Sequence, residues 1–148
     1  FFSNAGISIQ GHEEAPDEVW DRMWRVHVMA HVYAVRAVLP DMLAAKWGRI
    51  VNISSSSAQG GQQLMAAYVS SKAGMIGLTK SLALEFGRKG ITVNAVCAGL
   101  VDTALTAELP EKARAELLGM IPLGRTGPGA LLPLLLTMNV EADPPPVA

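Results

Sequence analysis

Cysteine and charged residues are scarce in this chain, and the scarcity of each excludes a class of protein. A single cysteine, Cys97, among 148 residues excludes an internal disulfide framework and a zinc site built on cysteines. Charged residues form 17% of the chain, and 12 basic against 13 acidic residues give a net charge of −1. This balance excludes a charged disordered tail and a protein that binds nucleic acid through bulk positive charge.

Long apolar runs are also missing. Half of the residues are hydrophobic, yet no uninterrupted apolar run reaches the roughly 20 residues of a membrane span. The longest run, 130–138, is short and contains Pro133. No secretory signal peptide is recognisable. We therefore expect a cytoplasmic protein that has neither a membrane nor nucleic acid as a partner.

The first residues indicate that the sequence is a fragment. Phe1 and Phe2 form an apolar pair that runs directly into the turn predicted at Ser3 and Asn4. Such a start is typical of the cut end of a strand, and the chain does not begin with methionine. We expect the chain to be part of a longer protein.

Short β-branched runs alternate with long helical stretches along the chain. The pattern predicts the end of a strand at 1–3 and two further strands over 49–54 and 91–97. It predicts helices over about 17–45, 66–86 and 110–120. Strands that alternate with long helices indicate an α/β fold with a parallel sheet and right-handed crossovers.

Prolines mark two places where this pattern is expected to break. Pro40 lies inside the first predicted helix and should bend or interrupt it. Beyond residue 126 no strand or helix pattern emerges, and five of the nine prolines of the chain lie there. We therefore predict a folded region over 1–126 and a poorly structured tail over 127–148.

Three polar residues are candidates for catalysis. Tyr68 and Lys72 lie four residues apart in a predicted helix and therefore share one face. Ser55 follows the predicted strand 49–54, and ligands of open α/β sheets bind beyond the carboxyl ends of strands. A lone Tyr-x-x-x-Lys pair is more often a surface or packing feature, so the functional interpretation depends on the position of Ser55.

The chemistry of such a triad is coherent. A phenol with a pKa near 10 is a poor base at neutral pH, and a nearby ammonium group stabilises its phenolate form. Tyr68 could then exchange a proton with an alkoxide, while Ser55 holds the same substrate oxygen by a hydrogen bond. Lys72 could also reach the hydroxyls of a bound ribose. Hydride transfer itself would require a nicotinamide, because no side chain transfers hydride.

Several segments, in this order, resemble the short-chain dehydrogenase/reductase family. The matching segments are 3–6 (Ser-Asn-Ala-Gly), 50–55 (Ile-Val-Asn-Ile-Ser-Ser), 68–74 (Tyr-Val-Ser-Ser-Lys-Ala-Gly), 93–99 (Val-Asn-Ala-Val-Cys-Ala-Gly) and 121–125 (Ile-Pro-Leu-Gly-Arg). The resemblance is nearly continuous from residue 1 to about 126. Within the family, the sequence is most similar in these segments to bacterial 3-oxoacyl-carrier-protein reductases and related hydroxyacyl or alcohol dehydrogenases.

The resemblance implies a fold and an activity. The fold is a Rossmann-like doubly wound parallel sheet, of which 1–126 would be the second, C-terminal half. The activity is NAD(P)-dependent interconversion of a ketone and a secondary alcohol, on a small-molecule substrate that could be a 3-oxoacyl thioester. The intact protein would be a homo-oligomer, either a dimer or a tetramer.

The resemblance also implies a role for individual residues. Ser55 would orient the substrate carbonyl, Tyr68 would be the acid/base, and Lys72 would support Tyr68 and bind the nicotinamide ribose. Two further groups would line the cofactor, one of Asn4, Ala5 and Gly6 and the other of Gly99, Val101 and Thr103. Thr103 would meet the carboxamide of the nicotinamide, and the loop from 103 to about 120 would close over the substrate.

His27 departs from the family, which usually has asparagine there to hold a water that relays protons to the lysine. Histidine also hydrogen-bonds water and titrates nearer neutrality, so His27 is a candidate catalytic relay. The alternative is that His27 packs against a neighbouring helix. His31 lies one turn further on, but no acidic third ligand is evident, so we expect no metal site.

The largest departure is the lack of the family's Gly-rich turn, which holds the pyrophosphate at a helix N-terminus. The residue that selects NAD from NADP is missing with it. An alternative hypothesis is therefore a catalytically inactive remnant that acts at most as an oligomerisation module. We expect the isolated chain to show no NAD(P)H binding and no activity, and we interpret the change of character after residue 126 as a reading-frame shift.

Overall fold

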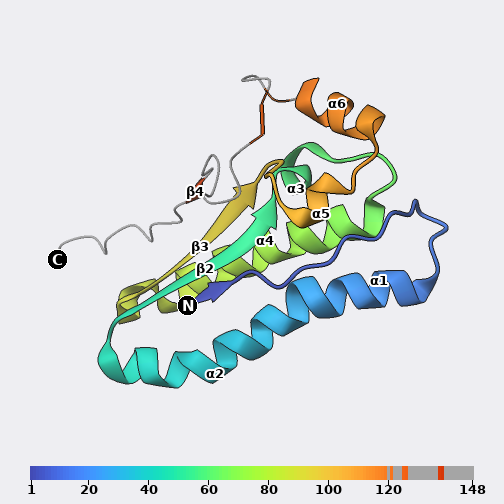
Figure 1. Cartoon of the computed structure of the whole chain (residues 1–148). Helices are drawn as coiled ribbons and strands as arrows, with labels where there is room; N and C mark the ends of the chain where they lie inside the picture. Colours follow the sequence, from blue (N-terminus) through green and yellow to red (C-terminus); the bar gives the residue numbers. More distant parts are fainter. Residues whose placement is uncertain (120, 122–124, 127–136, 139–148) are drawn as a thin grey trace.

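A computed structural model describes residues 1–119, 121, 125, 126, 137 and 138 (Figure 1). Its sheet has the strand order β1-β2-β3-β4. The parallel strands are β1 (Phe2–Ser3), β2 (Gly48–Ser55) and β3 (Ile91–Ala98). They confirm the three strands predicted from the sequence and the parallel sheet that they imply.

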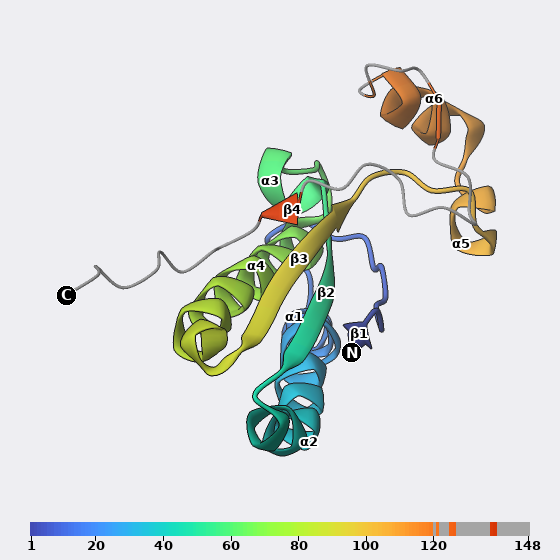
Figure 2. The same cartoon turned by 90° about the vertical axis from the view of Figure 1, so that its left-hand side faces the viewer.

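Two long helical stretches cover one face of this sheet (Figure 2). The first runs through α1 (Asp17–Trp24), the π-helical turn η1 (Arg25–Met29) and α2 (Ala30–Ala45). The second is α4 (Ala66–Phe86), which packs beside α1 and η1. One half of a doubly wound α/β fold has helices on one face of its parallel strands. The structure therefore has the partial Rossmann-like arrangement that the sequence predicts.

Alternation along the strands fixes which side of the sheet carries the core. In β2, Ile50, Asn52 and Ser54 are buried, Val51 and Ile53 between them are half-buried, and Arg49 is exposed. The apolar core joins β2 and β3 to α2 and α4 through the buried side chains of Val35, Ile50, Ala83, Phe86, Ile91 and Val93. Both helical stretches therefore pack on the same face, which brings α4 and η1 together above the strand ends.

Glycine is required where α4 turns into β3. The 3₁₀ turn η2 (Gly87–Lys89) leads to Gly90, whose φ is +83°. A Cβ at Gly90 would lie 2.1 Å from the carbonyl oxygen of Lys46, which follows α2. Only glycine meets both the left-handed backbone and this close approach, and the predicted end of the helix at 87–90 is confirmed.

The predicted interruption at Pro40 is wrong. α2 continues through Pro40 to Ala45. Pro40 is exposed, so the backbone carbonyl one turn earlier, which loses its N–H partner, lies on the solvent side of the helix where water can satisfy it. The helical stretch is irregular instead at the π-helical turn η1, which precedes Pro40 in the sequence.

Two short helices and one short strand were not predicted. α3 (Ser57–Gly60) follows β2, and α5 (Ala104–Ala107) precedes α6 (Glu111–Gly119), which confirms the helix predicted over 110–120. Within the predicted tail, β4 (Thr137–Met138) pairs antiparallel with Ala95 and Val96 of β3. The rest of 127–148, and with it the expected frame shift, lies outside the described residues.

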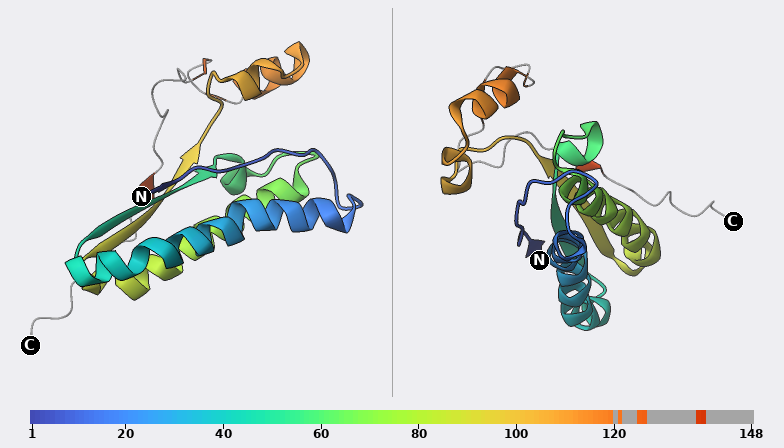
Figure 3. Two further views of the ribbon diagram at one scale, coloured as in Figure 1. Left: turned by 60° about the horizontal axis from the view of Figure 1, so that its bottom comes forward. Right: turned by 90° about the vertical axis from the view of Figure 1, so that its right-hand side faces the viewer.

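One described helical stretch, Asp17–Ala45, is long and apolar enough by composition to cross a membrane. The core helix of a globular protein passes the same test, so this is weak support for a span. In the structure this stretch packs against α4 and β2 (Figure 3). The expectation that the protein has no membrane partner stays a prediction.

Candidate active site

The candidate catalytic residues gather where β2 ends and α4 begins. Ser55 is the last residue of β2, and Tyr68 and Lys72 lie in the first two turns of α4. The Ser54 hydroxyl donates a hydrogen bond to the Lys72 backbone carbonyl at 2.9 Å. This bond ties the carboxyl end of the strand to the helix that carries Tyr68 and Lys72.

Lys72 is a buried ammonium beside the Tyr68 ring. Only 5% of the residue is exposed. Its Nζ donates a hydrogen bond to the Ile53 carbonyl at 2.8 Å and lies 5.9 Å from the centroid of the Tyr68 ring. Burial lowers the pKa of Lys72 to about 8, so Lys72 still carries its proton at neutral pH. The side chain is therefore a fixed positive charge next to the phenol.

Ser55 is buried at the strand end with its hydroxyl oriented by α3. The Ser57 backbone N–H donates to the Ser55 Oγ at 3.2 Å. Because this bond uses Ser55 Oγ as an acceptor, the hydroxyl hydrogen can be donated to another partner. Ser55 is thus arranged to donate to a ligand oxygen.

His27 lies in the π-helical turn η1 and is fully buried. Its Nε2 accepts the Ile7 backbone N–H at 3.1 Å, and its Nδ1 lies 2.8 Å from the Ser71 Oγ. Its ring meets the Tyr68 ring edge-on, with centroids 5.3 Å apart and planes at 88°. π-Helical turns occur often at functional sites, and this one places His27 between the segment after β1 and α4.

Electrostatics keep His27 neutral at pH 7. Burial, and then the positive charge of Lys72, lower the pKa of His27 to about 4. Burial likewise lowers the pKa of His31, whose Nε2 lies 3.1 Å from the Ser3 carbonyl. No group of His, Cys, Asp and Glu suited to a metal ion is found in the described part of the chain.

The segment expected to line the cofactor is open. Asn4, Ala5 and Gly6 are exposed after β1. A Cβ at Gly6 would lie 3.5 Å from His27 Nε2 and 3.6 Å from Lys72 Nζ. Because Gly6 has no side chain, it leaves a cradle directly beside the buried ammonium of Lys72. This cradle fits a ribose hydroxyl of a nicotinamide cofactor, or the nicotinamide ring attached to that ribose.

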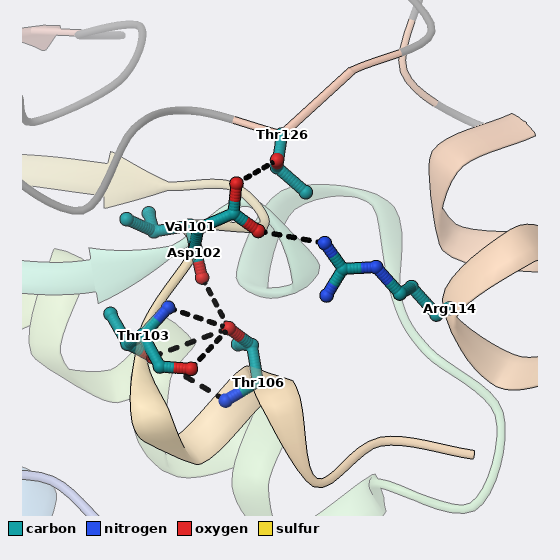
Figure 4. Close-up of polar contacts among 6 residues, drawn as sticks. All are labelled: Val101, Asp102, Thr103, Thr106, Arg114 and Thr126. Atoms are coloured by element: carbon teal, nitrogen blue, oxygen red, sulfur yellow. Dashed lines mark hydrogen bonds and ion pairs between the residues drawn. The ribbon is translucent and has the colours of Figure 1, made fainter. Parts of the chain in front are cut away.

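The second group that is expected to line the cofactor follows β3. Gly99 is exposed, and a Cβ there would meet only Ser56 Oγ, at 4.0 Å. Thr103 caps α5: its Oγ1 accepts the Thr106 backbone N–H at 3.4 Å, and its own N–H donates to Thr106 Oγ1 at 2.9 Å (Figure 4). The Thr106 hydroxyl also donates to the Val101 carbonyl at 2.5 Å. Thr103 is thus engaged in a capping box, a use that sequence interpretation did not assign.

Asp102 joins the end of β3 to the loop that carries α6. Its carboxylate accepts hydrogen bonds from Arg114 at 2.8 Å and from Thr126 at 2.5 Å (Figure 4). These residues lie 12 and 24 positions away in the chain, a spacing that carries no recognisable local pattern. Sequence analysis missed this cluster, which anchors the segment expected to close over the substrate.

Ser71 was also missed as a site residue. Its Oγ lies against His27, 44 residues earlier in the chain, and donates to the Tyr68 carbonyl at 2.8 Å. The available signal was its place inside the motif 68–74. A serine three residues after Tyr68 sits on the same side of a helix, but nothing local predicts a partner in another element.

The chain is similar to known proteins of one family. The family model described as short chain dehydrogenase matches residues 1–114. The 3-oxoacyl-[acyl-carrier-protein] reductase FabG of Pseudomonas aeruginosa is 44% identical over 126 residues, which are 84% of this chain and 51% of that protein. The acetoacetyl-CoA reductase of Shinella zoogloeoides is 40% identical over 128 residues, 84% of this chain and 53% of that protein.

A third relative is the D-beta-hydroxybutyrate dehydrogenase of Rhizobium meliloti. It is 39% identical over 114 residues, which are 76% of this chain and 44% of that protein. The chain spans about half the length of the curated relatives it matches. Since the family model matches residues 1–114 of the 148, the chain belongs to the short chain dehydrogenase family.

Proposed function

We propose that this chain supplies the acid/base residues of an NAD(P)-dependent oxidoreductase that interconverts a ketone and a secondary alcohol. The observation that carries the proposal is the buried ammonium of Lys72 beside the Tyr68 ring. Burial of a charge destabilises a fold, and Lys72 forms no ion pair within the described residues that would offset this cost. Strongly shifted groups at the end of a parallel strand are typical of active sites.

Each of the three residues has a distinct task. Tyr68 donates its phenolic proton to the oxygen of the ketone as negative charge develops there, and takes the proton back in the reverse direction. Lys72 stabilises the phenolate that remains. Ser55 donates a hydrogen bond to the same substrate oxygen, which fixes its position relative to Tyr68.

The cofactor would lie along the cradle at Gly6. A bound nicotinamide supplies or accepts the hydride, which no side chain does. Lys72 Nζ uses one of its three N–H donors on Ile53 within the described residues, so it retains donors for the ribose hydroxyls. Asn4, Ala5 and Gly6 would contact one side of the cofactor. Gly99, Val101 and Thr103 would contact the nicotinamide side.

The substrate class we propose is a 3-oxoacyl thioester. The support is the names of the relatives, which include a 3-oxoacyl-[acyl-carrier-protein] reductase and an acetoacetyl-CoA reductase. The segment over α5 and α6, anchored by Asp102 and Arg114, would cover the substrate. The working location we propose is the cytoplasm.

A homo-oligomer is the partner we propose for the intact protein. Large hydrophobic side chains are exposed on the helical face, among them Trp24 of α1 (47% exposed) and Leu84 of α4 (63% exposed). Exposed apolar groups of this size on neighbouring helices favour association with a second copy. The alternative is that the protein is a catalytically inactive remnant that acts at most as an oligomerisation module. In that case every form of the protein would lack reductase activity.

The experiment that tests the function is a reduction assay with acetoacetyl thioester and NADH or NADPH. It is performed on the protein in the longest form that its gene encodes, since the 148-residue chain alone is expected to bind no NAD(P)H. Tyr68→Phe should lower kcat by about 100-fold or more, the usual size of a lost acid/base group. Tyr33→Phe, which changes an exposed tyrosine of α2, is the matched control. Equal rates for the two variants would contradict the proposal.

A further inference from the structure

The Ser71 hydroxyl and the His27 imidazole are two buried polar groups that the proposed chemistry does not use directly. His27 is fully buried and Ser71 is 1% exposed. Their contact, 2.8 Å between Nδ1 and Oγ, joins η1 to α4 across 44 residues of sequence. Buried polar groups of this kind are held in one hydrogen-bonding arrangement because an unsatisfied partner is costly.

Ile7 and Ser71, which contact opposite nitrogens of the ring, together select one hydrogen-bonding arrangement. The Ile7 N–H only donates, so His27 Nε2, 3.1 Å away, must be the unprotonated acceptor. A neutral ring then carries its proton on Nδ1 and donates it to Ser71 Oγ. The Ser71 hydroxyl in turn donates to the Tyr68 carbonyl. All donors and acceptors of the pair are satisfied only in this direction.

The surrounding charges favour the same neutral form. Lys72 faces His27 from α4 and His31 faces it from α2, and both disfavour a second proton on the ring. The other aromatic neighbour is Tyr68, whose ring stands edge-on to the imidazole. A ring with both nitrogens occupied cannot pass a proton without first breaking one of these hydrogen bonds.

We propose that Ser71 is a positioning residue that holds His27 as the Nδ1–H tautomer, and that His27 thereby fixes the Asn4–Ile7 segment against the Tyr68 ring. His27 then acts as a rigid link and not as the proton relay expected from the sequence. The link joins the cradle at Gly6, whose Cβ position is 3.5 Å from Nε2, to the phenol. Its consequence for catalysis rests on the proposed function, whereas the tautomer does not.

The test that needs no activity is ¹⁵N NMR of the histidine rings. At pH 7 the His27 ring should show a protonated Nδ1 and an unprotonated Nε2, and the spectrum should persist from pH 5 to 8. Ser71→Ala should shift the ring toward a mixture of tautomers. Ser70→Ala, which changes the exposed neighbouring serine, should leave the signals unchanged. An Nε2–H tautomer, or Nδ1–H populations equal in the wild type and Ser71→Ala, would overturn the proposal.

Kinetics of the active protein test the link to catalysis. Ser71→Ala should lower kcat by about 10-fold, the scale of a slightly misplaced catalytic group, without changing the shape of the pH profile. His27→Asn, whose amide offers one acceptor and one donor, should retain more activity than His27→Leu. A pH profile that loses an ionisation in His27→Asn would instead identify a relay and overturn the positioning role. If neither the wild type nor any variant is active, the proposed function is wrong. The NMR experiment still decides whether Ser71 holds the Nδ1–H tautomer of His27.

Discussion

Two imidazoles and one ammonium, those of His27, His31 and Lys72, are buried, and the charge of Lys72 contributes to the lowered pKa of both histidines. His27 and His31 are fully buried, and Lys72 is 5% exposed. Burial is the first cause of the lowered pKa of each group. Three basic groups kept out of water cost stability, so their retention at the strand ends indicates function more than folding.

The lowered pKa of His27 makes the fold sensitive to acid. In the folded protein the ring titrates at about 4, whereas the unfolded chain takes up the proton near 6.5. Between these values the unfolded state binds more protons, so the free energy of unfolding falls as the pH falls. We expect His27 to contribute a loss of about 2 kcal/mol between pH 6.5 and 5, and His31 to add to it in the same direction.

Urea unfolding at pH 7 and pH 5 measures this loss. His27→Asn, which cannot take up a proton, should show a smaller difference between the two pH values than the wild type. His12→Asn changes an exposed histidine and should leave the His27 contribution in place. An acid loss of the same size in His27→Asn and in the wild type would show that the imidazole is not held neutral by the fold.

At the scale of elements, the turn from α4 to β3 is fixed by contact with the turn from α2 to β2. Gly90 has no side chain and adopts a left-handed backbone conformation. The Lys46 carbonyl oxygen occupies the space where a Cβ of residue 90 would lie. The Arg49 guanidinium donates to the Gly90 carbonyl at 3.3 Å. These contacts set the register in which Gly48 pairs with Ile91.

Gly90→Ala should therefore destabilise the protein by about 1–3 kcal/mol, the usual cost of a strained backbone position, and by more if Lys46 cannot move. The matched control is Gly77→Ala in α4, where a Cβ would meet nothing within 4 Å. Alanine there should stabilise the helix by about 0.5–1 kcal/mol. Thermal or urea unfolding of both variants is the measurement, and equal stabilities would contradict this description of the turn.

The regular elements were predictable where sequence pattern and tertiary packing agree. The helix 66–86 and the strand 91–98 follow from periodicity, β-branched residues and the glycines between them. The π-helical turn at 25–29 was not predictable, because Val26 and Val28 fit an ordinary helix equally well. The turn carries His27, whose partners Ile7 and Ser71 lie far away in the sequence.

The candidate site shows the same division. Ser55, Tyr68 and Lys72 could be identified because their spacing places them at one strand end and on one helix face. The contacts around the site could not be identified: Ser54 binds the Lys72 carbonyl of α4, and Asp102, beyond β3, binds Arg114 of α6. Such contacts arise only after the elements pack, and no local pattern encodes them.

At the scale of the whole molecule, the described half of the sheet leaves apolar helices uncovered. Leu84 of α4 is 63% exposed, and a helical face with such residues is expected to bury them against a second copy. Leu84→Glu should lower the mass measured by sedimentation or light scattering. Gln10→Glu adds the same charge outside α4 and should not. A monomeric wild type would contradict the proposed association.

The central claim is that Tyr68 and Lys72 act as one unit on a ketone oxygen. The measurement that tests it most directly is kcat for acetoacetyl thioester reduction by the wild type, Tyr68→Phe, Lys72→Met and the double variant. Residues that act as a unit have non-additive effects, so we expect the double variant to be no slower than Tyr68→Phe. Losses that multiply, or a Tyr68→Phe variant as fast as the wild type, would contradict it.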